Sequence, residues 1–162
     1  MATTRDNTGR KEGRVSSRGR IRAISVSKEK GTQKVNVPEA ELLADFGIIG
    51  DAHAGNWHRQ VSLLGAESIN KMIEKGAKVS PGSFAENITT EGIDLLALEV
   101  GAKLRIGESA RLEITQFGKK CHSRCEIFQQ VGDCVMPREG VFAKVTSPGR
   151  LAVGDIIEVV DD

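Results

Sequence analysis

The residues best suited to chemistry gather around one cysteine in a basic stretch of the chain. Cys121 follows Lys119 and Lys120 and is followed closely by His122 and Arg124. The thiolate is the reactive form of cysteine, and neighbouring cations stabilise it. The stretch also lies where a loop is predicted to become a helix, whose N-terminal dipole favours anions. The pattern predicts a nucleophile or a sulfur ligand at Cys121. An idle cysteine beside solvated lysines explains the spacing equally well.

A thiolate-rich metal site is a second interpretation of this region. The chain has three cysteines, Cys121, Cys125 and Cys134, which together with His122 offer ligands for zinc. Zinc sites usually pair close cysteines twice, whereas this chain has one Cys-x3-Cys pair and a lone third cysteine. The pattern therefore favours zinc only weakly. Cys125 also fits an apolar helical stripe, which favours core packing for its side chain.

Polar residues that suit ligand binding occur in an earlier glycine-rich segment. Asp51, His53 and His58 are candidate metal ligands or acid–base groups, and Arg59 suits a phosphate or a carboxylate. Two structural roles explain these residues as well: Asp51 as a residue that stabilises a turn, and Arg59 as the ion-pair partner of an acidic neighbour. The periodicity of the sequence does not decide between the functional and the structural roles. Further along, Asn87 is a candidate for orienting a ligand. A local structural hydrogen bond is the commoner role for such an asparagine.

Many short strands and few helices are predicted around these motifs. Ile69, Met72 and Ile73 have helical spacing, and Gly76 follows where a helix would end. Residues 28–36 form a polar, lysine-rich connection. Strands are predicted at 21–26, 35–37, 60–64, 84–90, 103–106, 111–116, 141–145 and 151–160, with a turn at Gly154–Asp155 before the last strand, and a second helix is predicted at 121–131. This order predicts a mainly β fold, a β-barrel with a few short helices.

Length and composition are those of a single soluble domain. The chain has 162 residues, no apolar run long enough for a membrane span and no apolar leader, so we expect a cytoplasmic protein without a membrane partner. Aromatic residues make up 4% of the chain, which argues against a base-stacking surface for nucleic acid. Residues 1–20 are basic and lack hydrophobic periodicity. We expect a disordered tail there and a folded domain over 21–162.

The order of the motifs resembles the MOSC domain, the C-terminal domain of molybdenum cofactor sulfurases. The resemblance runs from about Ile21 to the C-terminus. It rests on Gly50–Gly55, His58–Leu64, Pro81–Thr89, Gly92–Leu95, Gly118–Cys121, Gly140–Ala143 and Gly154–Asp155. It implies a barrel of the MOSC or pyruvate-kinase type and a key cysteine after the predicted strand 111–116. Cys121 occupies that position.

The resemblance implies a sulfur-carrier or molybdenum-cofactor-binding module that acts through Cys121. The molybdenum cofactor is an anion that bears a phosphate and soft sulfur ligands, so a thiolate among cations suits it. Cys121 is the expected catalytic residue and metal ligand. The residues expected to hold the cofactor are Arg59, Asn87, Lys119, Lys120, Arg124 and His53.

Two alternatives and several partners also follow from the resemblance. The alternatives are a molybdenum-cofactor-dependent reductase of N-hydroxylated compounds and a non-catalytic zinc–thiolate scaffold. A cysteine desulfurase or molybdopterin biosynthesis proteins are the expected partners. Pyridoxal phosphate is expected only through a separate partner or a fused desulfurase domain, because this chain is too short to contain one.

Overall fold

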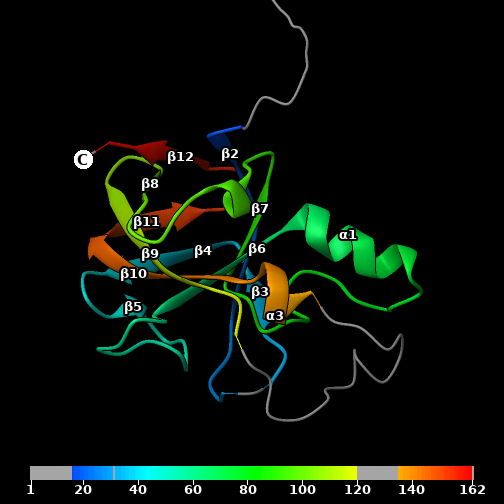
Figure 1. Ribbon diagram of the computed structural model, residues 1–162. Helices are drawn as coiled ribbons and strands as arrows, with labels where there is room; N and C mark the ends of the chain where they lie inside the picture. The colour runs from blue at the N-terminus through cyan, green and yellow to red at the C-terminus, as the bar shows by residue number, and fades with distance from the viewer. Residues whose placement is uncertain (1–15, 31, 120–134, 162) are drawn as a thin grey trace, which may run out of the picture.

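Short strands form most of the computed structural model, which describes residues 16–30, 32–119 and 135–161. Seven strands close a barrel in the order β12-β8-β9-β10-β6-β7-β2, and pairing of β12 with β2 completes the ring (Figure 1). The mainly β barrel predicted from the sequence is confirmed. The barrel strands are β2 (Arg18–Val26), β6 (Val61–Gly65), β7 (Ile88–Glu91), β8 (Lys103–Ile106), β9 (Ala110–Phe117), β10 (Val141–Ser147) and β12 (Ile156–Val160).

Alternation of apolar and polar residues explains how these strands fill the barrel. In β8 the side chains of Leu104 and Ile106 are fully buried, and β9 contributes Leu112 and Ile114 in the same way. Leu104 lies opposite Leu112 in the antiparallel β8–β9 ladder. Because successive side chains of a strand point to opposite faces, one face of each strand lines the core. The barrel interior is therefore a packed core, and a ligand has to bind at its ends or outside it.

Further elements cover the outside of the barrel. The helix α1 (Ala66–Glu74) buries Ile69 and Met72, as its spacing predicts, whereas Ile73 is 47% exposed. Gly76 has a positive φ of 99°, the backbone conformation expected just after a helix. The remaining elements are β3 (Val35–Val37), β4 (Glu39–Leu43), β5 (Gly47–Ile48), the 3-10 helix η1 (Leu95–Ala97), α3 (Met136–Glu139) and β11 (Gly149–Ala152).

Long-range pairing explains where the structure departs from the predicted elements. β4 was not predicted, and it forms because Glu39–Leu43 pairs with β11 in a separate small sheet. Within the predicted segment 151–160, the predicted turn at Gly154–Asp155 lies between two separate strands, β11 and β12, of which β11 belongs to the small sheet. The predicted segment 84–90 is strand only from Ile88 onward. Single-strand periodicity carries no information about partners that lie far along the chain.

Two further predictions concern the start of the first strand and segments outside the described residues. β2 begins at Arg18, three residues before the predicted strand start at Ile21. Residues 1–15 lie outside the described residues, so a disordered tail stays a prediction. The predicted helix 121–131 also lies outside them. None of the described helices has the length and apolar character needed to span a membrane.

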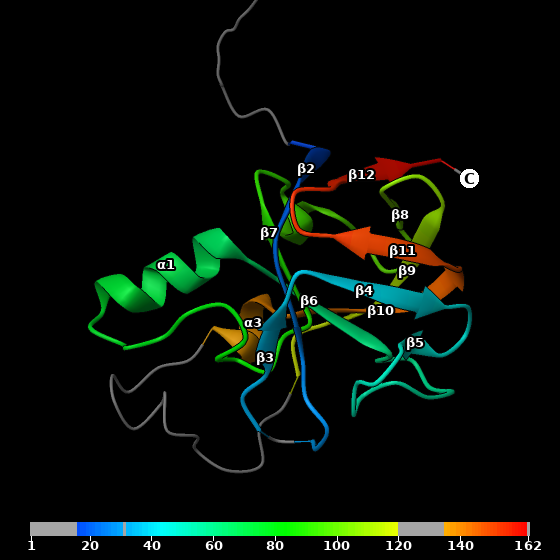
Figure 2. The same cartoon turned by 180° about the vertical axis from the view of Figure 1, so that it is seen from behind.

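Three connecting segments meet at one end of the barrel. They are the β2–β3 connection, the loop from β5 to β6, and the end of β9 where the chain continues toward Lys119. Figures 1 and 2 place all three at the lower end of the barrel, away from the marked C-terminus. The residues predicted to do chemistry at positions 53, 59 and 119 belong to these segments. The topology therefore brings together residues that lie more than sixty positions apart in the sequence.

Candidate functional site

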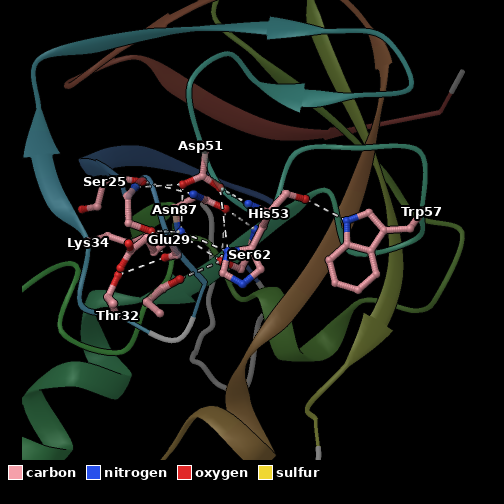
Figure 3. Close-up of polar contacts among 11 residues, drawn as sticks. Ser25, Glu29, Thr32, Lys34, Asp51, His53, Trp57, Ser62 and Asn87 are labelled. Carbon is pink, nitrogen blue, oxygen red and sulfur yellow. Dashed lines mark hydrogen bonds and ion pairs between the residues drawn. The ribbon is translucent and has the colours of Figure 1, made fainter.

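A buried lysine that the sequence did not single out lies at the centre of this end. Lys34 ends the β2–β3 connection, and its side chain has no exposed surface. Its Nζ donates to Asp51 Oδ1 at 2.8 Å and to Ser27 Oγ at 3.0 Å, and it lies 3.0 Å from His53 Nδ1 (Figure 3). A buried charge persists only where it is paired and hydrogen-bonded. We call Ser27, Lys34, Asp51 and His53 the lysine–histidine network.

Asp51 holds this network to the β5–β6 loop. Its Oδ1 accepts the backbone N–H of Ser27 at 3.1 Å, and its Oδ2 accepts the backbone N–H of His53 at 3.0 Å. Burial by itself raises the pKa of Asp51, but the hydrogen bond and charge of Lys34 and the two backbone donors outweigh it. The net pKa lies below its ordinary value, so Asp51 is ionised at neutral pH and serves as the counter-ion of Lys34.

His53 is held neutral by its surroundings. The pKa of His53 is lowered to about 4, because burial and the charges of Lys34, Lys119 and Lys30 together outweigh the opposing charge of Asp51. Its side chain is 22% exposed. The charges of Lys119 and Lys30 act on the ring, and Lys30 also lies beside the Trp57 ring that stacks on His53. His53 is therefore a neutral polar group among cations at neutral pH.

The Trp57 ring contacts two of the cations at this end of the barrel. Trp57 stacks on the His53 ring at 6.5 Å between centroids and donates its indole N–H to the His53 carbonyl at 2.7 Å (Figure 3). Arg59 Cζ lies 4.7 Å from the centroid of the Trp57 ring, and Lys30 Nζ lies 4.9 Å from it. Both are cation–π contacts. We call Lys30, Lys34, His53, Trp57, Arg59 and Lys119 the basic cluster.

One donor atom of Arg59, the buried Nε, has no hydrogen-bond partner within the described residues. The Arg59 guanidinium also lies 5.5 Å from the Phe142 ring centroid, so it is held between two aromatic side chains, Phe142 and Trp57. A buried donor without a partner is costly, and such donors call for an explanation such as a bound ligand. An oxygen-rich anion would satisfy this one.

The basic cluster is tied to the strand that leads to Cys121. His58 Nε2 hydrogen-bonds Gln116 Oε1 at 2.9 Å, and Gln116 donates to the Gly118 carbonyl at 2.8 Å. The N–H of Gly118 donates to the Gly140 carbonyl at 2.7 Å. Gly118 has a φ of 69°, and a Cβ there would lie 2.2 Å from the Pro137 carbonyl oxygen. Only glycine fits this close approach, so the backbone next to Lys119 is firmly positioned.

A second buried polar network surrounds Asn87, the residue considered from the sequence for orienting a ligand, and its neighbour Glu86. Asn87 is fully buried; its Oδ1 accepts the Ser62 N–H at 3.0 Å, and its Nδ2 donates to the Ser25 carbonyl at 3.1 Å. Burial raises the pKa of Glu86, whose carboxyl group accepts hydrogen bonds from the Gly82 and Phe84 backbone and from Thr89 Oγ1. We call Ser25, Ser62, Glu86, Asn87 and Thr89 the asparagine network. Its contacts join strands β2, β6 and β7.

The structure brings together only part of the predicted site. His53, Arg59 and Lys119 belong to the basic cluster, whereas Asn87 lies within the asparagine network. The predicted roles of Cys121, Lys120 and Arg124 concern positions outside the described residues, as does the zinc–thiolate alternative with Cys125 and Cys134. Within the described residues, no group of three or more histidine, cysteine or acidic side chains could hold a metal ion. The roles of all these residues stay predictions.

Sequence reasoning missed Lys34, Lys30 and Ser27. All three lie in a connection that looked polar and solvated from its composition. The only available signal was the accumulation of lysines in residues 28–36, and lysine is more often a surface residue. Lys34 is buried beside Asp51 because the β2–β3 connection and the β5–β6 loop approach each other, and local sequence patterns do not predict this approach.

Comparison with known proteins identifies the family. The MOSC domain model matches residues 50–158, and the chain therefore belongs to the MOSC domain family. This family is associated with molybdenum cofactor biology, so the chain is a molybdenum-cofactor-related module in that general sense. No curated protein sequence gives a significant match.

Solved structures show the same fold. The YuaD protein of Bacillus subtilis is 20% identical with a TM-score of 0.73, and the alignment covers 88% of this chain and 95% of that one. YiiM of Escherichia coli is 20% identical with a TM-score of 0.61, covering 88% and 70%. YiiM of Geobacillus stearothermophilus is 16% identical with a TM-score of 0.64, covering 88% and 75%. At these identities the likeness establishes the fold alone.

Proposed function

We propose that this chain is a sulfur-carrier or molybdenum-cofactor-binding module in which Cys121 is the persulfide-forming nucleophile or the metal ligand. The basic cluster would hold the anion beside it. The observation that carries the proposal is the buried Nε of Arg59, which lacks a partner among the described residues and lies amid cations. Family membership supplies the class of ligand.

The donor set of the basic cluster fits an anionic, phosphate-bearing cofactor. Arg59 offers a planar guanidinium fixed by Trp57 and Phe142, which suits the oxygens of a phosphate. Lys30 and Lys119 add positive charge near the His53 ring. When bound, the cofactor would supply a molybdenum centre capable of redox or sulfur chemistry. The residues of the cluster would bind and orient its anionic part.

The position of Cys121 along the chain supports its role. It stands two residues after Lys119, whose backbone N–H donates to the Pro137 carbonyl at 3.3 Å. Lys119 is close enough to lower the pKa of His53. The cations that would stabilise a thiolate or a persulfide are thus the ones that would hold the anion. Cysteine desulfurases and molybdopterin biosynthesis proteins remain the proposed partners.

Metal and sulfur analysis of purified protein tests the proposal. Wild type, Cys121→Ser and Arg59→Met would be purified from a molybdenum-replete host and assayed for molybdenum, pterin, zinc and persulfide. We expect Cys121→Ser to lose most of its molybdenum or persulfide while staying folded. We expect Arg59→Met to bind the cofactor about tenfold more weakly, because one charge-assisted contact is worth about 1.5 kcal/mol.

The matched control is Arg105→Met, since Arg105 pairs with Glu158 on the barrel wall at 3.2 Å. It should retain wild-type content. Full molybdenum and sulfur content in Cys121→Ser would contradict the proposal. Stoichiometric zinc without molybdenum would favour the scaffold alternative instead. Reduction of N-hydroxylated compounds by molybdenum-loaded protein would place the chain among the reductases.

A further inference from the structure

We propose that Lys34 holds His53 as the neutral tautomer that carries its proton on Nε2, and that this N–H donates to an oxygen of the anion bound at the basic cluster. Lys34 is then a positioning residue and His53 a ligand-binding residue. The inference rests on the proposed function only in placing an oxygen-bearing anion at this cluster. It does not depend on Cys121.

The three N–H groups of the lysine match the three acceptors around it. An ammonium group has three donors and no acceptor. Lys34 Nζ lies 2.8 Å from Asp51 Oδ1, 3.0 Å from Ser27 Oγ and 3.0 Å from His53 Nδ1. The Ser27 hydroxyl donates its own proton to the Glu29 carbonyl at 2.9 Å, so toward Lys34 it accepts. Each donor of Lys34 thus has one acceptor, and His53 Nδ1 is the third.

A neutral lysine would not satisfy the same group of atoms. The Asp51 carboxylate has no exposed surface, and Lys34 is the cation that contacts it at 2.8 Å. An ionised carboxylate that is buried without a counter-ion costs several kcal/mol. Protonation of Lys34 avoids that cost. The proton between Lys34 and His53 therefore belongs to the lysine.

The tautomer of His53 follows from this assignment. A neutral imidazole has one donor and one acceptor nitrogen, so when Nδ1 accepts, Nε2 carries the hydrogen. A second proton on the ring is disfavoured, because burial and the charges of Lys34, Lys119 and Lys30 oppose it more strongly than Asp51 favours it. The ring is thereby a hydrogen-bond donor and is unsuited to act as a base or as a metal ligand through Nδ1.

The surroundings of Nε2 indicate the kind of partner that it would take. No hydrogen bond of Nε2 exists within the described part of the chain, and the side chain is 22% exposed. The charges that act on the ring, other than that of Asp51, are those of lysines, and the Asp51 carboxylate lies on the Nδ1 side, where Oδ2 is 3.8 Å from Nδ1 and accepts the His53 backbone N–H. A donor surrounded by cations calls for an acceptor from outside. An anionic oxygen meets that need and gains from the same positive charge.

Nitrogen NMR of the unmodified protein tests the tautomer directly. Two-bond nitrogen–proton correlations distinguish a protonated Nδ1 from a protonated Nε2. We expect wild type at pH 7 to show a neutral His53 ring with its proton on Nε2. A ring with its proton on Nδ1, or a charged ring, would overturn the inference. In Lys34→Met the single tautomer should give way to a mixture and the pKa of His53 should rise, changes that a merely structural lysine would not produce.

A matched pair of substitutions tests the donor, with inorganic phosphate as the probe. In His53→Gln the amide N–H falls near the position of Nε2, whereas in His53→Asn the amide oxygen can still accept from Lys34 but the outer donor is lost. We expect His53→Gln to bind phosphate within threefold of wild type and His53→Asn to bind it about tenfold more weakly. Equal loss in both, or no loss in either, would contradict the inference.

Phosphate binding separates this inference from the proposed function. Cys121→Ser should bind phosphate as wild type does, even if it loses molybdenum or persulfide. Failure of wild type to bind phosphate would overturn the inference while leaving the cofactor analysis to decide the function. Phosphate binding by wild type without any molybdenum or persulfide would contradict the proposed function and leave the role of His53 intact.

Discussion

Two buried polar networks in this barrel differ in whether their hydrogen bonds are complete. In the asparagine network, the Asn87 side chain bonds to Ser62 and Ser25 within the protein. The lysine–histidine network shares Lys34 and His53 with the basic cluster, where His53 Nε2 and the buried Arg59 Nε lack partners within the described residues. Closed networks fix a fold, whereas open ones leave donors for a ligand. The asparagine network therefore has a structural role, whereas we propose a ligand-binding role for the lysine–histidine network.

The two networks also differ in charge. Burial raises the pKa of Glu86, whose neighbours are backbone donors and a threonine hydroxyl. Asp51 has its pKa lowered, because the Lys34 ammonium and backbone donors outweigh its burial. In the first network the carboxyl group is surrounded by uncharged donors, whereas the second network depends on an ion pair. Substitutions at Asp51 and Asn87, and titration of His53, each test this difference between the two networks.

The largest effect is expected at Asp51. In Asp51→Asn the Lys34 ammonium stays buried without its counter-ion, and we expect the free energy of unfolding to fall by about 3 kcal/mol. Urea denaturation monitored by Trp57 fluorescence would measure this. Asp94→Asn, at an exposed position, is the matched control and should change stability by less than about 0.5 kcal/mol. Equal stability of the two variants would mean that Lys34 is not paired as described.

A somewhat smaller loss of stability is expected at Asn87. Asn87→Ala leaves the buried Ser62 N–H and Ser25 carbonyl without partners, so we expect a loss of about 2 kcal/mol in the free energy of unfolding. Asn70→Ala, on the exposed side of α1, should be nearly neutral. Cofactor content per folded molecule should stay at the wild-type level in Asn87→Ala. A loss of cofactor without a loss of stability would instead support the predicted binding role of Asn87.

The last effect is the pH dependence that His53 contributes to stability. Its pKa is about 4 in the folded protein and near 6.5 when unfolded, so between these values the unfolded state binds more protons. His53 therefore contributes stability above pH 6.5 that is lost as the pH falls toward 4. The pKa of Asp51 is lowered in the folded protein, so its contribution is lost only as the pH falls below its ordinary pKa of 3.8, and the two pH windows are separate. Urea midpoints at pH 7 and pH 4.5 should differ less in His53→Gln than in wild type. The same difference in both proteins would contradict the assignment.

Local patterns were sufficient for much of the fold. Alternation in 103–106 and 111–116 predicted β8 and β9, and the spacing of Ile69 and Met72 predicted α1. Each of these elements buries one face, and the apolar residues of that face recur in the sequence with the period of a strand or a helix. β4 shows no such periodicity, because its formation depends on hydrogen bonds with β11. Prediction succeeded where the periodicity within one segment reflects its own burial.

The amino-acid sequence by itself determined the family, the barrel class and the candidate status of His53, Arg59 and Lys119, because the motifs and strand periodicities are local. The closing of the barrel decided the rest. It buried Lys34 against Asp51 and used the Asn87 side chain to join Ser62 and Ser25. Whether a polar residue is paired, buried or left with a free donor depends on segments far along the chain, and only the tertiary structure brings those segments together.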